Sequence, residues 1–103
     1  MTYDRELLES AAKAAGIDYY ARAQSGGMLT DNGEWNPLTD DGDTLRLAVK
    51  KRLRIVFTDK TVQVWESEDA PRALAVEWLH PDPYAATRRA IVRAAAEIGR
   101  SKT

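Results

Sequence analysis

The nine residues from Trp35 to Asp43 (WNPLTDDGD) constrain this chain more than any other stretch. Pro37 disfavours the α region for the residue before it, so the backbone must be extended up to that point. Thr39 or Asp40 then offers a side-chain oxygen to the free N–H groups at the start of a helix. The stretch therefore predicts that an extended segment ends at Pro37 and that a helix begins near Asp40 or Asp41.

This second helix is predicted to bury an apolar stripe whose positions recur at intervals of three and four residues. The stripe consists of Leu45, Ala48, Val49 and Leu53. Acidic residues at the start of the helix and basic residues at its end complement the helix dipole.

The first part of the chain predicts a helix followed by a hairpin. Thr2 is the expected N-cap of a helix over residues 3–15, and Gly16 is placed to end it in the left-handed conformation. Residues 17–22 and 28–30 contain β-type residues on either side of a glycine-containing turn, which predicts a short hairpin. An Asn-Gly pair within residues 31–33 predicts a second turn.

The second half predicts three strands and a closing helix. Pro83 suits the first position of that helix after an N-cap at Asp82, and Gly99 is expected to end it. The expected strands cover residues 54–58, 61–66 and 72–79, and the expected helix covers residues 83–98. The buried stripe predicted for this helix is Tyr84, Thr87, Ile91, Ala94, Ala95 and Ile98.

Together these elements predict an α+β fold with three helices and a mainly antiparallel sheet of about 4–5 strands, in the order αββαβββα. Apolar residues occupy both parities of residues 55–57 and of residues 74–76, which predicts a sheet covered on both faces. We therefore expect a three-layer α/β/α sandwich. A chain of 103 residues is long enough for one domain, so residues 1–103 are expected to form a single unit with a frayed tail at 100–103.

Composition and charge bound the functional classes. The hydrophobic fraction of 44% is that of a folded domain, and the absence of cysteine excludes a disulfide framework and a thiolate metal site. Neither a secretory signal nor a membrane-spanning run is seen, so a cytoplasmic location outside the membrane is expected. Residues 1–43 carry three basic and nine acidic groups, and residues 44–103 carry twelve and seven, so the halves have net charges of −6 and +5. This split can orient a charged partner.

Two groups of residues are candidates for chemistry. Asp40, Asp41 and Asp43, with Asp31 and Glu34 upstream, could offer oxygens to a hard cation, but their spacing lacks the pattern of a calcium loop. The alternative is that these carboxylates cap the second helix. His80 could pair with Asp82 as an acid–base unit, or it could be a loop histidine without a catalytic role. We therefore assign no catalytic, metal or cofactor residue.

Two further groups are candidates for binding. The arginines of the last helix could meet phosphate together with the basic run at residues 50–54, or they could form a solvated basic face. The pI of about 5.8 is low for a nucleic-acid module. Tryptophan and arginine are enriched at protein interfaces, and each tryptophan could equally be a core residue. The candidate interaction residues are Trp35, Trp65, Trp78, Arg88, Arg89 and Arg93.

Two motifs resemble those of a known protein family: residues 35–43 with the LRLAV that follows them, and DPYAATRRAIVRAA at residues 82–95. On these motifs the chain resembles the small phage and prophage proteins of the phage ABA sandwich type, over roughly residues 5–100. The resemblance implies an α/β/α sandwich of phage origin. It implies no established activity, cofactor or catalytic residue.

The leading functional hypothesis is a non-enzymatic phage or prophage accessory protein that binds a host or phage protein in the bacterial cytoplasm. The first alternative is nucleic-acid binding through the basic helix faces. The second is a small metal-dependent enzyme around the acidic junction. A homodimer formed through an exposed edge strand or a tryptophan-lined face is left open.

Overall fold

The computed structural model describes residues 2–101, which form three helices and six strands in the order αβββαβββα. The elements are α1 (Thr2–Ala15), β1 (Ala21–Arg22), β2 (Met28–Thr30), β3 (Gly33–Trp35), α2 (Asp41–Lys51), β4 (Arg54–Phe57), β5 (Thr61–Trp65), β6 (Ala75–Trp78) and α3 (Pro83–Arg100). The α+β class, the three helices and the antiparallel pairing are therefore confirmed.

Capping residues set the helix boundaries, largely as the sequence predicts. Gly16 ends α1 with a positive φ of 68°, and the N–H of Ile17 donates to the carbonyl of Ala12 at 2.9 Å. Asp40 and Asp82 are the N-caps of α2 and α3, and Pro83 occupies the first turn of α3. At the other end, α1 already includes Thr2, whose side chain lies outside the described part of the chain, so its predicted capping role stays a prediction.

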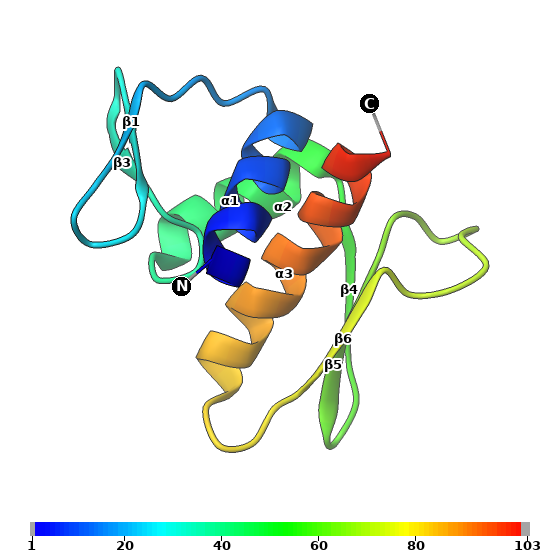
Figure 1. The fold of residues 1–103 in the computed structure, drawn as a ribbon. Helices are drawn as coiled ribbons and strands as arrows, with labels where there is room; N and C mark the ends of the chain where they lie inside the picture. The colour runs from blue at the N-terminus through cyan, green and yellow to red at the C-terminus, as the bar shows by residue number, and fades with distance from the viewer. Residues whose placement is uncertain (1, 102–103) are drawn as a thin grey trace.

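The strands form two separate three-stranded antiparallel sheets. The first, β1-β2-β3, projects from one side of the molecule (Figure 1), and the buried pair Met28 and Trp35 anchors it in the core. The predicted second turn is its β2–β3 turn, where Gly33 has a positive φ of 108°. The predicted first strand is shorter than expected, because residues 17–20 are not in a strand.

Helix α3 is the centre of the fold. It packs along α1 on one side and against β5 and β6 on the other, as Figure 1 shows, and α2 also contacts it. Since α3 has neighbours on two sides, its middle and end are buried nearly all round. The buried residues of α3 are Ala90, Ile91, Val92, Ala94, Ala95, Ala96 and Gly99. Of the stripe predicted for this helix, Tyr84 is wrong, because its side chain is exposed.

Alanine and glycine allow α1 and α3 to lie very close together. Ala11, Ala12 and Ala15 of α1 are buried in the same cluster as Ala94 and Ala95 of α3. Gly99 does not end α3 as predicted, since the helix continues to Arg100. A Cβ added at Gly99 would lie 2.0 Å from the carbonyl oxygen of Ser10. Gly99 is therefore a contact residue between helices.

The stripe predicted for α2 is correct only in part, since Ala48 is buried and Leu53 packs against the core but the other two residues do not. Leu45 and Val49 are exposed, whereas Thr44, Leu47 and Ala48 are buried. The hydroxyl of Thr44 donates to the carbonyl of Pro37, which ties this side of the helix to the loop before it. Hydrogen bonds at the start of α2 thus fix how the helix is turned about its own axis. The spacing of its apolar residues alone does not predict this orientation.

The register of the second sheet, β4-β5-β6, assigns its residues to two faces. Directly opposed residues of antiparallel strands share a face, and alternate residues along a strand change face. The inner face, toward α3, holds Ile55, Phe57, Val62, Val64, Ala75 and Glu77. The outer face holds Arg54, Val56, Thr61, Gln63, Trp65, Val76 and Trp78.

The expected three-layer α/β/α sandwich with one sheet of about 4–5 strands is not confirmed. The described residues form two sheets, and the helices in contact with the second sheet lie on its inner face (Figure 1). Apolar residues at both odd and even positions of β4 and β6 predicted that both faces of the sheet are covered. That prediction is wrong for the outer face, because Val76 there is 49% exposed. Of the tail that was predicted to fray, Arg100 is helical, and Lys102 and Thr103 lie outside the described residues.

Candidate interaction surfaces

The acidic junction before α2 is built from hydrogen bonds within the chain. The Oδ2 atom of Asp40 accepts from the N–H of Asp43 at 2.8 Å, which is the N-cap bond. The Oδ2 atom of Asp43 accepts from the N–H of Asn36 at 2.9 Å, and its Oδ1 atom accepts from Arg46 at 2.8 Å. The capping alternative of the sequence analysis is therefore the one that the structure supports for Asp40 and Asp43.

The other three carboxylates considered as cation ligands lie apart, and two of them interact with separate partners. Asp41 pairs with Arg88 of α3 at 2.7 Å. Glu34 accepts a hydrogen bond from Ser25, and Asp31 lies in the β2–β3 turn. Among residues 2–101, no three acidic or histidine side chains are grouped so that they could hold a metal ion.

We predict that Asp43→Ala lowers the free energy of unfolding by about 2 kcal/mol, because the buried N–H of Asn36 would lose its acceptor. Asp43→Asn should be milder, since an amide oxygen can still accept that bond. Denaturant unfolding of both variants checks the expectation, and Asp69→Ala is the control because Asp69 is exposed in the loop between β5 and β6. Equal losses for Asp43→Ala and Asp69→Ala would contradict the assignment of a structural role to Asp43.

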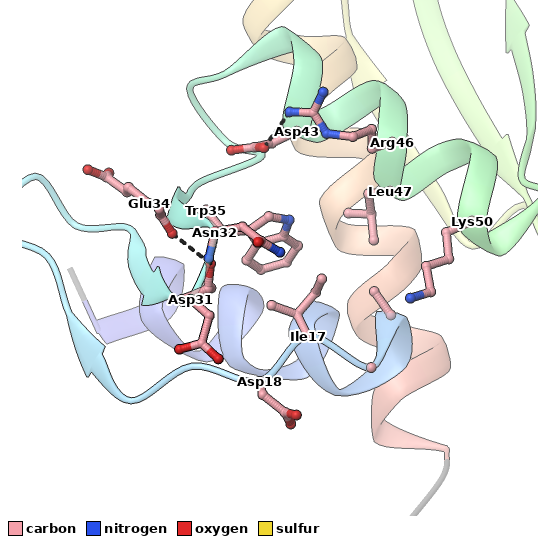
Figure 2. Close-up of a pocket in the computed structure, with 14 residues that line it drawn as sticks. Ile17, Asp18, Asp31, Asn32, Glu34, Trp35, Asp43, Arg46, Leu47 and Lys50 are labelled. Carbon is pink, nitrogen blue, oxygen red and sulfur yellow. Dashed lines mark hydrogen bonds and ion pairs between the residues drawn. The ribbon is translucent and has the colours of Figure 1, made fainter.

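A pocket of about 670 Å³ lies beside this junction, between the end of α1, the first sheet and α2 (Figure 2). Ile17, Trp35 and Leu47 line its apolar part. In Figure 2, Ile17 and Leu47 point toward the Trp35 ring, and Asp18 lies at the edge of the group. Lys50 and several acidic residues also line the pocket, so its charge does not select a single class of ligand.

The three arginines proposed as a phosphate-binding group each connect α3 to a different element. Arg88 donates from Nε to the carbonyl of Leu38 at 3.0 Å and pairs with Asp41. Arg89 pairs with Asp4 of α1 at 3.1 Å and lies over the ring of Tyr3. Arg93 pairs with Glu77 of β6 and donates to the carbonyl of Val76 at 3.2 Å.

These ion pairs change the interpretation of the basic helix face. Each of the three guanidinium groups already has a carboxylate partner and is partly buried. A phosphate would have to displace that carboxylate, whereas nucleic-acid binding relies on protein cations that are free to neutralise phosphates and so release the counterions condensed on the nucleic acid. The structure therefore gives the nucleic-acid alternative no prepared basic surface at these arginines.

The three tryptophans are not brought together. Trp35 is 8% exposed and belongs to the core, which was the alternative to an interaction role for this residue. Trp65 and Trp78 lie on the outer face of the second sheet, toward opposite ends of β5 and β6. Trp65 is partly buried, and its indole N–H donates to Gln63 at 3.2 Å. Trp78 is 69% exposed.

The outer face of β4-β5-β6 carries several apolar side chains that are exposed or only partly buried. It combines the exposed side chains of Val76 and Trp78 with Val56 and Trp65, which are partly buried. The guanidinium of Arg54 lies 5.7 Å from the centre of the Trp65 ring, within the range of a cation–π contact. Trp65 and Trp78 are candidates from the sequence alone, whereas the strand register is needed to place Val56, Val76 and Arg54 on the same surface.

His80 and Asp82 do not form the acid–base unit considered from the sequence. In the described part of the chain, the Asp82 carboxylate accepts from the N–H groups of Tyr84 and Ala85, both at 3.1 Å, and no hydrogen bond joins it to His80. His80 is exposed at the end of the loop before α3 and borders a second pocket of about 440 Å³.

No family model matches the chain, and neither the curated proteins nor the solved structures contain a match. Within the described residues, the helices lack the length and the apolar run needed to cross a bilayer.

Proposed function

We propose that this chain is a phage- or prophage-encoded accessory protein that binds a host or phage protein in the bacterial cytoplasm through the outer face of β4-β5-β6. The observation that carries the proposal is the exposure of Val76 and Trp78 on a sheet face that no helix of the described residues covers. Neighbouring exposed apolar side chains of this kind mark interaction sites. The resemblance of residues 35–43 and 82–95 to phage proteins supplies the biological context.

The composition of this face suits a binding surface. Tryptophan and arginine contribute most often to the energetic centre of protein interfaces. Here Trp65, Trp78 and Arg54 lie on one face, with Val56 and Val76 on either side of Gln63. The Trp65–Gln63 hydrogen bond and the Arg54 contact hold one aromatic ring in place. A ring that is ordered before binding loses little conformational entropy when a partner arrives.

The size of the face favours a single helix as its occupant. Three strands about 4.8 Å apart, each four or five residues long, give a surface roughly 10–15 Å wide and 15 Å long. An α-helix of about three turns has similar dimensions. An interface of standard size needs about 800 Å² per partner, which is more than this face offers. We infer that the partner lays an amphipathic helix across the sheet, with an acidic residue against Arg54.

Affinity capture with matched variants tests the proposal. The wild-type chain, the double variant Val76→Lys/Trp78→Lys and the control Tyr84→Lys are immobilised and exposed to a bacterial lysate, with and without phage infection. Tyr84 is exposed and lies in the first turn of α3, outside the strands that form the face. We expect a protein retained by wild type and by Tyr84→Lys and lost by the double variant.

The captured protein is then purified and titrated against the same three chains by calorimetry. The proposal predicts at least a tenfold weaker Kd for the double variant, because lysine would be buried against the partner's apolar stripe. Equal retention and equal affinity for the double variant and the control would place the binding surface elsewhere and refute the proposal.

A further inference from the structure

The two outer strands of the second sheet, β4 and β6, differ in how well their free edges are protected from pairing with another strand. In an antiparallel pair, alternate residues direct their N–H and C=O groups toward the neighbouring strand, and the residues between direct theirs away. The N–H of Thr58 donates to Thr61, and the N–H of Leu79 donates to Lys60, both at 2.9 Å. With the strand registers, these bonds identify which groups face outward: those of Ile55 and Phe57 on β4, and those of Val76 and Trp78 on β6.

The β6 edge is partly occupied by α3. The outward carbonyl of Val76 accepts a hydrogen bond from Nη1 of Arg93, and the same nitrogen pairs with the carboxylate of Glu77. A charged side chain held at this position obstructs an incoming strand, as charged groups do on the protected edges of many sheets.

The β4 edge has no comparable protection. In the part of the chain that the structure describes, no hydrogen bond reaches the N–H or C=O of Ile55 or Phe57 from outside the strand. The Phe57 side chain is 59% exposed at this edge, although it belongs to the inner face of the sheet. An open edge with an exposed aromatic side chain is a template for pairing with another strand.

We propose that the occupant of this edge is β4 of a second copy of the chain, paired antiparallel about a two-fold axis at Val56. In this register Ile55 of each copy forms a hydrogen-bonded pair with Phe57 of the other, so all four outward groups of each strand are satisfied. Phe57 of one copy also packs beside Ile55 of the other on the inner face. Arg54 lies opposite Thr58, so no like charges face each other within β4.

The neighbouring registers are less favourable for reasons that the chain itself provides. A two-fold axis at Ile55 would require the N–H of Leu53, which is already bonded to the carbonyl of Ala48 at 3.0 Å. A two-fold axis at Phe57 would place Arg54 opposite Lys60 of the other copy, with two positive charges in direct opposition. With the axis at Val56 the residue opposite Lys60 is Arg52, which lies outside β4 in the left-handed conformation, so neither cost falls on β4 itself.

Pairing in this way produces one continuous six-stranded sheet from two copies. The axis is perpendicular to the sheet, so both outer faces lie on the same side and meet at the two Val56 side chains. The pairing does not depend on the proposed partner protein. It would double the exposed apolar face, which allows a bivalent partner to bind with higher avidity.

Sedimentation velocity over a concentration series, up to on the order of 1 mM because the interface is small, tests the pairing. We expect a monomer–dimer equilibrium for wild type and for the β6-edge control Trp78→Lys, and a monomer for Phe57→Lys. A wild-type chain that stays monomeric throughout, or a Phe57→Lys chain that dimerises like wild type, overturns the proposal.

A cross-linking experiment tests the register and does not depend on the folding of Phe57→Lys. The chain has no cysteine, so a single one can be introduced at Val56, where the two copies form a non-hydrogen-bonded pair with Cβ atoms about 5 Å apart. Mild oxidation should cross-link Val56→Cys much faster than the exposed control Val76→Cys. Equal rates for the two variants would refute the two-fold axis at Val56, whatever the outcome of partner capture.

Discussion

Gly99→Ala is expected to lower the free energy of unfolding by about 3 kcal/mol, at the upper end of the usual cost of overpacking. The added Cβ would lie 2.0 Å from the carbonyl oxygen and 2.9 Å from the carbonyl carbon of Ser10, and 3.3 Å from the nitrogen of Ala14. All three are backbone atoms of α1, so no side chain can rotate to make room. The helices would have to separate along an interface that is close-packed through alanines.

Gly42→Ala is the matched control, because it makes the same chemical change within another helix. The Cβ there would meet side-chain atoms of Arg46 and Asp40 at 3.2–3.3 Å, and the long Arg46 side chain can move. Alanine is also the better helix former, so this variant should be neutral or stabilised by up to about 1 kcal/mol. Urea denaturation followed by circular dichroism measures both, and equal midpoints would show that α1 and α3 are not in close contact at Gly99.

Trp35→Ala is expected to cost about 3–5 kcal/mol, the range for removing a large aromatic side chain from a core. Trp35 is 8% exposed, lies opposite Met28 in the first sheet, and packs in the same cluster as the helices. Its loss would release the projecting β1-β2-β3 sheet from the body as well as leave a cavity. The melting temperature should fall by well over ten degrees.

Trp78→Ala provides the comparison for Trp35→Ala. The Trp78 side chain is 69% exposed, so its removal should change the free energy of unfolding by no more than about 0.5 kcal/mol. If both tryptophan variants lost similar stability, the assignment of Trp35 to the core and of Trp78 to the surface would be wrong.

Local signals predicted most of the secondary structure. Asp40 and Asp82 mark helix starts because their side chains accept hydrogen bonds from free N–H groups of the first turn, and Pro83 fits there because it has no N–H. Gly16 marks a helix end because it adopts a positive φ. The hairpin of β4 and β5 follows from alternation of Val62 and Val64 with polar neighbours. These features depend on neighbours along the chain, so the sequence displays them directly.

Features that depend on the packing of distant segments were missed. Gly99 looks like a helix end until α1 is placed against it. Leu45 and Val49 have the spacing of a buried stripe, yet the bonds from Asp43 and Thr44 to the preceding loop turn that side of α2 toward solvent. Alternation along β4 and β6 likewise cannot show whether a second layer is present to cover Val76.

The candidate site was predicted in part. Trp65 and Trp78 are candidate interaction residues that lie on the outer face of the second sheet, and their role in binding stays a prediction, whereas Trp35 belongs to the core. Arg88, Arg89 and Arg93 were grouped by their spacing on one helix. The structure separates their roles, because each is paired with a carboxylate from a different element: Asp41, Asp4 and Glu77.

The stability of Val76→Lys/Trp78→Lys compared with that of Val62→Lys tests most directly whether the outer face of β4-β5-β6 is open in the isolated chain. Val76 and Trp78 are exposed on this face, whereas Val62 on the inner face is fully buried. Urea denaturation at low protein concentration should show a loss of no more than about 1 kcal/mol for the double variant. Val62→Lys should lose several kcal/mol or fail to fold, because its charge would be buried. A double variant as damaged as Val62→Lys would mean that another part of the chain covers the face, and would contradict its assignment as a binding surface.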